Sequence, residues 1–286
     1  MLDAPELAPL LDVAEIAYLA VESKHGPMVT PLLFTVRDGR LWMVMPRSSA
    51  KVGAIGRDRR VGVAAGSLGG AMALVQGEAR IVDPLDPRSL VGSIPETLLS
   101  PRALGSYVTG HLAHLAGMVG PAMLEPRAAA AVRPERALAV RAGAALWSSG
   151  DWSEADPPDG GSAERLPLRL PADVPDELRR ATAEAGPVLV GWTTATGPVV
   201  LPGEWDPRRS VAAVRLDLFI ATGGLPRSAA CVLFDTTEGT SLAGKAGLVV
   251  RGRGLAREQG ENAELTVDTE RISWWRGDDA RTVEAG

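Results

Sequence analysis

The stretch that decides the fold is Gly26-Pro27-Met28-Val29-Thr30-Pro31, which returns 171 residues later as Gly197-Pro198-Val199-Val200-Leu201-Pro202. Two further segments return in the same order: Val75-Gln76-Gly77 as Val250-Arg251-Gly252, and Leu138–Asp151 as Leu265–Asp278. Segments that return in a fixed order are the sequence signature of a repeated structural unit. The sequence therefore predicts a diverged tandem duplication, with a first copy over residues 1–152 and a second over residues 185–286.

Each copy has the pattern of short antiparallel strands. In the first copy, runs of apolar and β-branched residues are separated by turn residues such as Asp38-Gly39, a strong hairpin signal. The runs are 16–22, 28–36, 41–45, 60–65 and 71–82. Because they show no sustained alternation with helical patterns, they favour a β-barrel or a β-sandwich over a parallel α/β sheet. The predicted fold class is mainly β with minor α.

Two segments do not fit the repeat. The second recurring segment is repeated after 175 residues, but the third is repeated after only 127, which is 48 fewer. The first copy must therefore contain an insertion of about this length between the two segments. The stretch Pro87–Glu135, which has a helical pattern, is the predicted insertion. Between the copies, residues 153–184 combine a proline-rich stretch, Ser153–Pro175, with a short polar helix expected over Asp176–Ala185. This composition indicates an exposed linker.

The charge and the rare side chains exclude several classes of protein. The chain carries 30 Lys and Arg against 35 Asp and Glu, so no overall basic field attracts nucleic acid or an anionic membrane. The longest charge-free run, Ala103–Leu124, contains four glycines and Pro121, and it makes a poor membrane span. A single cysteine, Cys231, excludes an intrachain disulfide and favours a reducing, cytoplasmic compartment. His111 and His114 have no third histidine nearby, so we predict no metal site.

The segment Met45–Ile55 carries the candidate chemistry. A strand ends there, Ser48 and Ser49 follow, and a helical pattern begins with Lys51 in its first turn. The backbone N–H groups and the positive end of the dipole at a helix start favour an anion, and Arg47 adds a second positive charge. These are the residues of a phosphate cradle. The alternative is an ordinary serine N-cap with solvated basic neighbours.

The order of the motifs resembles the pyridoxamine 5'-phosphate oxidase-like family of FMN-binding split β-barrels. The motifs that carry the resemblance are Gly26–Pro31, Leu41–Met45, Arg47-Ser48-Ser49-Ala50-Lys51, Arg57–Val63 and Val75–Arg80. The resemblance is good over residues 10–90 and fainter over 138–151 and 186–278. It implies tandem split β-barrels that pack as an intrachain pseudo-dimer, and it leaves a further homodimer open.

The resemblance also implies a cofactor site. In this family the Ser-x-Lys after the hairpin strand holds the FMN phosphate, so Ser48, Ser49 and Lys51 would hold it here, with Arg47 beside them. The residues that would line the ring are Met28, Val29, Thr30, Pro31, Val44 and Met45. Because a flavin carries its own redox chemistry, the resemblance implies an oxidoreductase that moves hydride or electrons to or from a small organic substrate, without naming a catalytic residue.

The sequence departs from the family in three places. Met72 stands where the family has a glutamine, and Arg271–Gly286 shows no match to the basic substrate-phosphate residues, so oxidation of pyridoxamine phosphate is not implied. In the second copy the stretch that corresponds to Ser-x-Lys, Thr222–Ala229, has no lysine and no helix start. This predicts at most one cofactor per chain, with Lys245 and Trp205 as second-copy candidates to close its pocket.

Two other functions stay open. The family includes members that resemble carriers or sensors of flavin, deazaflavin or haem, so the chain could be a non-catalytic binding protein. It could also be an interaction scaffold that has lost its ligand, although the retention of Ser49 and Lys51 argues against this. The absorption spectrum of the purified protein separates these functions, since FMN and haem absorb in different bands.

Overall fold

The computed structural model describes residues 1–14, 16–83, 127–161, 168–236, 246–276 and 279–284. The elements of the first copy are α1 (Ala8–Val13), β1 (Ile16–Ser23), β2 (Gly26–Arg37), β3 (Arg40–Pro46), α2 (Ala50–Arg57), β4 (Arg60–Gly66), β5 (Ala71–Val82), β6 (Arg127–Arg141) and β7 (Ala144–Ser149). Those of the second copy are α5 (Asp176–Ala183), β8 (Gly186–Thr194), β9 (Gly197–Asp206), β10 (Val211–Arg215), α6 (Leu216–Ala221), β11 (Arg227–Asp235), β12 (Ala246–Gln259), β13 (Asn262–Arg276) and β14 (Asp279–Glu284). None of the helices in these ranges is long and apolar enough to span a bilayer.

The first copy is a closed antiparallel barrel. Its strands follow the order β3-β2-β1-β4-β5-β6-β7, and an additional pairing of β3 with β6 closes the ring over six strands. Strand β7 extends the sheet beyond the ring by pairing with β6. Closure leaves no unpaired edge within the ring, so the barrel needs no partner to satisfy its backbone.

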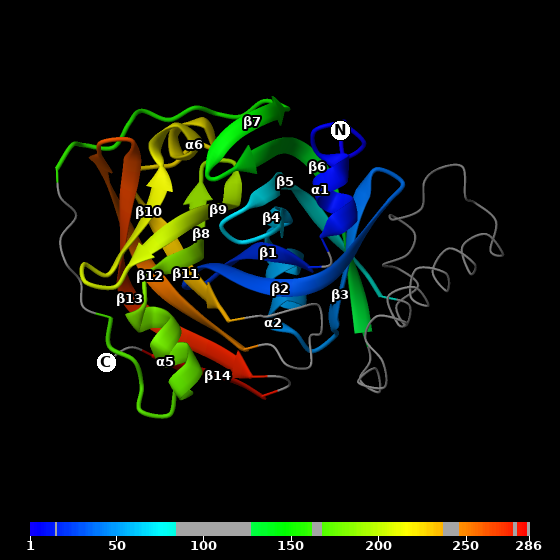
Figure 1. Ribbon diagram of the computed structural model, residues 1–286. Coiled ribbons are helices and arrows are strands. Elements are labelled where there is room, and N and C mark those ends of the chain that lie inside the picture. The colour runs from blue at the N-terminus through cyan, green and yellow to red at the C-terminus, as the bar shows by residue number, and fades with distance from the viewer. Residues whose placement is uncertain (15, 84–126, 162–167, 237–245, 277–278, 285–286) are drawn as a thin grey trace.

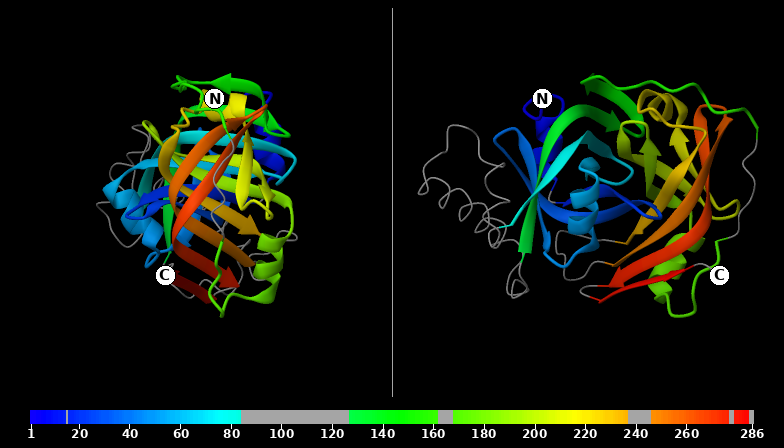
Figure 2. Two further views of the ribbon diagram at one scale, coloured as in Figure 1. Left: turned by 90° about the vertical axis from the view of Figure 1, so that its left-hand side faces the viewer. Right: turned by 180° about the vertical axis from the view of Figure 1, so that it is seen from behind.

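The second copy repeats this topology strand for strand. Its order is β10-β9-β8-β11-β12-β13-β14, and β10 pairs with β13 to close the second ring. Figures 1 and 2 show the two barrels side by side, the first in blue to green and the second in yellow to red. The predicted mainly β fold of two tandem barrels is confirmed.

The repeated turn decides where the strands begin. Gly26 and Gly197 are the first residues of β2 and β9, and their φ angles of 86° and 122° lie in the region that favours glycine. The predicted strand runs of the first copy are found within one to two residues, and β5 has the predicted bounds of 71–82. Alternating apolar residues and glycine turns therefore locate the strands well.

The third recurring segment was aligned wrongly. In the structure Gln76 pairs with Arg136, and Arg251 pairs with Arg271, at a β-bulge that both copies share. This equivalence sets the spacing of β6 and β13 at 135 residues, whereas the sequence alignment had used 127. Trp147 consequently lies in β7 while Trp274 lies in β13.

The bounds of the predicted insertion also need correction. Its last nine residues, Arg127–Glu135, form the first part of β6 and pair with β3 and β5. The remaining part of the insertion, with His111 and His114, lies outside the described residues.

The linker contacts the second barrel more closely than its composition indicated. Glu258 on β12 donates a backbone hydrogen bond to Asp159, and Gly161 donates one back to Glu258. Farther along, Val174 is buried in the core of the second barrel, and Ala155 donates to the carbonyl of Ile220 in α6. The described part of the linker therefore packs along the second barrel and is not a fully exposed segment.

The two barrels pack against each other through equivalent strands. Strand β2 contacts β8, β11 and β12 of the second copy, and its equivalent β9 contacts β1, β4 and β5 of the first. This reciprocal pattern is the contact pattern of a two-fold dimer, formed here within one chain. Apolar residues of the first copy, among them Tyr18, Val29 and Met72, join the core of the second barrel in one continuous cluster.

Glycines allow the backbones to approach at this interface. A Cβ placed on Gly62 of β4 would lie 2.6 Å from the carbonyl oxygen of Pro198 and 2.9 Å from the Cα of Val199. A Cβ on Gly191 of β8 would lie 2.6 Å from the sulfur of Cys231 and 2.7 Å from a methyl group of Val29. Cys231 is fully buried and belongs to this core, as the sequence indicated.

Candidate functional site

The predicted helix start after β3 is present. Helix α2 begins at Ala50, and its N-cap is Ser49, whose hydroxyl accepts a hydrogen bond from the backbone N–H of Lys51 at 3.3 Å. Ser49 in turn donates its own backbone N–H to the carbonyl of Pro46, which fixes the turn between strand and helix. The backbone N–H of Val52 donates to the carbonyl of Ser49 at 3.0 Å, so Ser49 accepts hydrogen bonds from both Lys51 and Val52.

Lys51 is the unusual member of this turn. Its side chain lies on the helix face of Ala54 and Ile55, three and four positions further on, and both of these are buried against the barrel. Burial therefore lowers the pKa of the Lys51 ammonium from 10.5 to about 8. Among the described residues this ammonium has no hydrogen-bond or ion-pair partner. A desolvated cation at the positive end of a helix is destabilising unless an anion accompanies it.

This arrangement predicts that removing the charge stabilises the ligand-free protein. We expect Lys51→Met to raise the free energy of unfolding at pH 7 by about 1–3 kcal/mol. Because the folded pKa is the lower one, the unfolded state binds more protons between pH 8 and 10.5, and the wild type gains stability as pH rises through this window. Urea unfolding at pH 7 and at pH 10.5 should show the advantage of the variant at pH 7 only. Equal stabilities at pH 7 would mean that the ammonium is already satisfied.

Arg47 is less available than the sequence indicated. Its Nε lies 2.5 Å from a carboxylate oxygen of Asp83, which follows β5 and is nearly buried. An ion pair of this kind neutralises much of the charge that Arg47 would offer to a phosphate. Ser48, the other cradle residue that precedes α2, is exposed. The strongest unpaired charge at the start of α2 is therefore that of Lys51.

The predicted ring-binding residues of β2 face two sides of the strand. Val29 belongs to the cluster between the barrels, whereas Met28 packs against the core of the first barrel. Thr30 has a buried hydroxyl oxygen that makes no hydrogen bond with any described residue. Pro31, opposite Tyr18, is partly exposed. A ligand between the barrels would meet Val29 and Pro31, because alternate residues of a strand share a face.

The two predicted residues at the end of β3 cannot both line that pocket. Met45 is fully buried in the core of the first barrel, and Val44 lies in a separate cluster with Trp42 and Ala129. Neighbouring residues of a strand point to opposite faces, so a single wall can include only one of them. Which of the two contacts the flavin ring stays a prediction.

The second-copy equivalent of α2 is α6, and the sequence had placed it too late. Topology matches Pro46–Ala50 with the junction of β10 and α6, where Arg215 is the N-cap. Thr222–Ala229, the stretch first considered, follows α6 and leads into β11. A helix start is thus retained in the second copy, contrary to the prediction. However, Arg215 there is paired with Asp217 and with Glu261 at 2.8 Å, so no partnerless cation equivalent to Lys51 is present.

The second-copy candidates for closing the pocket receive no support. Trp205 donates its ring N–H to the carbonyl of Thr182 at 2.8 Å and packs edge-on against Phe234, inside the second copy. Lys245 lies outside the described residues. Their role at the cofactor stays a prediction for Lys245, whereas the polar group of Trp205 is already used.

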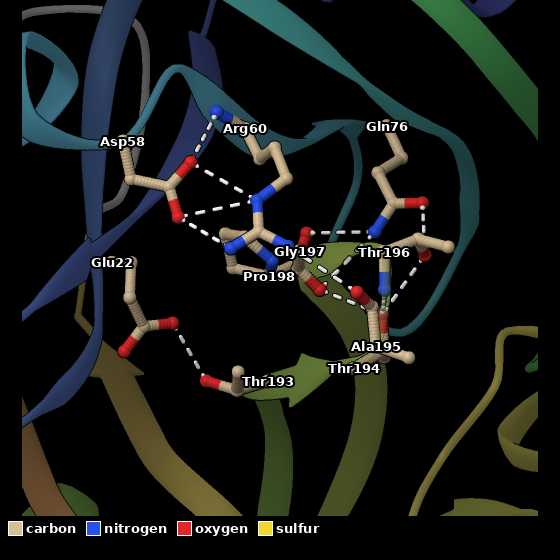
Figure 3. A network of polar contacts seen from close by, with 10 residues as sticks. All are labelled: Glu22, Asp58, Arg60, Gln76, Thr193, Thr194, Ala195, Thr196, Gly197 and Pro198. Atoms are coloured by element: carbon tan, nitrogen blue, oxygen red, sulfur yellow. Dashed lines mark hydrogen bonds and ion pairs between the residues drawn. The ribbon is translucent and has the colours of Figure 1, made fainter.

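A polar network across the interface was missed by the sequence reasoning (Figure 3). The amide of Gln76 donates to the carbonyl of Gly197 at 3.2 Å, and its oxygen accepts from Thr196 and Arg136. Nearby, Thr193 donates to Glu22 at 2.8 Å, and burial raises the pKa of this glutamate. The one signal available was the repeat Val75-Gln76-Gly77, in which a polar residue precedes a bulge glycine.

The comparison with known proteins adds structural neighbours. No protein-family model and no curated protein matches the sequence. Among solved structures, general stress protein 26 from Bacillus anthracis is 16% identical, with a TM-score of 0.36, over 49% of this chain and 95% of that one. A pyridoxinephosphate oxidase family protein related to general stress protein 26, from Clostridium acetobutylicum, is 14% identical with a TM-score of 0.34, over 50% and 90%.

The neighbours also include an FAD-binding protein from Mesorhizobium loti, which is 18% identical with a TM-score of 0.34, over 47% of this chain and 91% of that one. The structural neighbours are pyridoxamine 5'-phosphate oxidase-like proteins. Each of these three matches extends over about half of this chain.

Proposed function

We propose that the chain binds one FMN, with its phosphate at the start of α2, and acts as a flavin-dependent oxidoreductase on a small organic molecule. The observation that carries this proposal is Lys51, a half-buried lysine at the start of α2 whose ammonium has no hydrogen-bond or ion-pair partner among the described residues. A partnerless cation of this kind destabilises the ligand-free protein, and a bound anion would offset that destabilisation. The resemblance of the surrounding motifs to FMN-binding split barrels supports the choice of ligand.

The residues present fit a phosphate. Lys51 would supply the charge, and the hydroxyls of Ser48 and Ser49 with the positive end of the α2 dipole would complete the cradle. Of the predicted ring-lining residues of β2, Pro31 is partly exposed and would border a planar ring, whereas Val29 is fully buried between the barrels. The flavin, when bound, supplies the capacity to accept and return hydride or single electrons. The chain's own part is to bind, to orient and to keep water from the ring.

The same site could serve a carrier instead of an enzyme, and the oxidoreductase could use deazaflavin in place of FMN. We expect purified protein to absorb in the flavin bands, or to acquire them when FMN is added. A haem Soret band, or binding of deazaflavin in preference to FMN, would overturn the choice of cofactor, and the absence of any electron transfer by the loaded protein would favour the carrier function.

The asymmetry of the two helix starts predicts a stoichiometry of one FMN per chain. Only the first copy offers an unpaired cation at this position among the described residues, because Arg215 is held by two carboxylates. Titration of FMN fluorescence with protein of known concentration should reach its end point at one equivalent. An end point of two would show that the second copy also binds a cofactor.

A further inference from the structure

Arg251 of β12 is a buried cation on the interface side of the second barrel. Only 5% of its surface is exposed. It pairs across the sheet with Cys231 and so faces the first copy, as Cys231 does. Its guanidinium donates to the hydroxyls of Ser273 at 2.9 Å and Ser23 at 3.4 Å, and its Nε, which is buried, has no partner.

The first copy shows what this position requires when no charge is present. Gln76 occupies the equivalent place before the bulge glycine, and its amide is satisfied by carbonyls of the second copy and by Arg136 and Thr196. The two bulges are alike, since a Cβ on Gly77 or Gly252 would meet a backbone oxygen at 2.1 Å or 1.8 Å. The second copy therefore has a cation where the first copy has a neutral, fully bonded side chain.

A second cation lies beside Arg251. Arg271 is its cross-strand partner on β13, and the Nε of Arg271 is also buried without a partner. The carboxylate that Arg271 contacts, at 2.9 Å, is that of Glu284, whose side chain is 80% exposed. Burial and the neighbouring Arg271 both lower the pKa of Arg251. Of these two adjacent guanidiniums, that of Arg271 has a solvated carboxylate partner, whereas that of Arg251 is buried with hydroxyl partners only among the described residues. A buried charge without a counter-ion is costly.

We propose that Arg251 and Arg271 bind an oxyanion, the phosphate or carboxylate group of a small molecule, at the bulge of β12. Two guanidiniums offer paired N–H donors whose geometry suits either group. The hydroxyls of Ser23 and Ser273 contact the guanidinium of Arg251, and Thr282 contacts Ser273 at 2.9 Å. Thr282 is exposed, so the cluster is open to solvent on the side of β14. This site is distinct from the start of α2 and does not depend on FMN.

Calorimetric titration with inorganic phosphate, and separately with acetate, at an ionic strength held constant with sodium chloride tests this site. We expect wild-type protein to bind one of the two anions in the millimolar range, and the preferred anion identifies the class of ligand. Arg251→Gln copies the first-copy residue into the second copy, and should weaken binding about tenfold or more. The same variant should unfold at a higher temperature than wild type when no anion is present. If Arg251→Gln does not fold, Arg271→Gln takes its place.

Three controls locate the bound anion. Arg253→Gln removes the same charge two residues away, from an exposed side chain paired with Asp268 and Glu270, and should leave binding unchanged. Lys51→Ala removes any phosphate bound at the start of α2, and the binding event that depends on Arg251 should remain in this variant. Loss of binding in Lys51→Ala alone would assign the anion to α2. Loss in Arg80→Gln would assign it to a cavity of about 260 Å³ that Arg80 shares with Arg40 and Arg59. Either result, or no binding in wild type, overturns the proposal.

Discussion

Lys51→Ala should weaken FMN binding about ten- to a hundredfold. A charge-assisted hydrogen bond from a desolvated ammonium to a phosphate contributes about 1.5–3 kcal/mol, which corresponds to this loss of affinity. The variant should keep its fold, because the ammonium makes no hydrogen bond or ion pair with the described residues that would be lost. Calorimetric titration with FMN measures the change directly. Riboflavin, which lacks the phosphate, should bind wild type and variant equally.

Two arginines of the second copy provide matched controls for this loss of charge. Arg215 occupies the helix start equivalent to that of α2, and Arg227, the residue indicated by the sequence, is exposed at the first position of β11. Neither Arg215→Ala nor Arg227→Ala should change FMN affinity. A loss in Arg215→Ala equal to that in Lys51→Ala would show that both helix starts bind the cofactor, and that the second copy is not degenerate.

Gly62→Ala should lower the free energy of unfolding by about 2–3 kcal/mol, at the upper end of the range for overpacking. The new methyl group would meet backbone atoms of Pro198 and Val199, which cannot rotate away as a side chain could. The barrels would have to separate locally, and this would expose part of the apolar cluster that joins them. Urea unfolding at pH 7 should give a lower midpoint, and cooperativity is lost if the barrels then unfold separately.

Gly56→Ala is the control for Gly62→Ala. Gly56 lies on the exposed face of α2, with no atom within 4 Å of the position that a Cβ would take. Alanine in a helix interior is favoured over glycine by about 0.5–1 kcal/mol, so this variant should be more stable than wild type. A similar loss of stability in both variants would remove the close approach of the barrels as the explanation.

Local sequence signals predicted the strands because the turns depend on single residue types. Gly26 and Gly197 adopt backbone angles that few other residues allow, so their recurrence marked equivalent turns correctly. The alignment of the third recurring segment was wrong because its matched Trp, Gly and Asp residues are not restricted to one backbone geometry. The β-bulge that fixes the true spacing depends on pairing between strands. In the first copy β5 and β6 are separated by residues 83–126, whereas in the second copy β12 and β13 form a hairpin, so no common sequence spacing marks the bulge.

The candidate site was predicted in part, for a related reason. Ser49 and Lys51 act through the local geometry of a helix start, and the structure places them as expected. The availability of Arg47 depends on Asp83, which lies at the end of another strand. The burial of Arg251 could not be predicted, because its surroundings come from β1 and β13 and no pattern within β12 shows that these elements cover it.

The residue pair at the close contact of the barrels differs between the first copy and the second, and only a tandem chain permits this difference. On one side Gly62 of β4 pairs with Ala20 of β1, and at the equivalent place Cys231 of β11 pairs with Gly191 of β8. The smaller residue has thus changed strands between the copies. In a homodimer every substitution appears twice, so such an exchange would have to be tolerated at both contacts at once. A gene that encodes both halves exposes each change to selection at one contact, and the two halves can acquire different duties by single mutations.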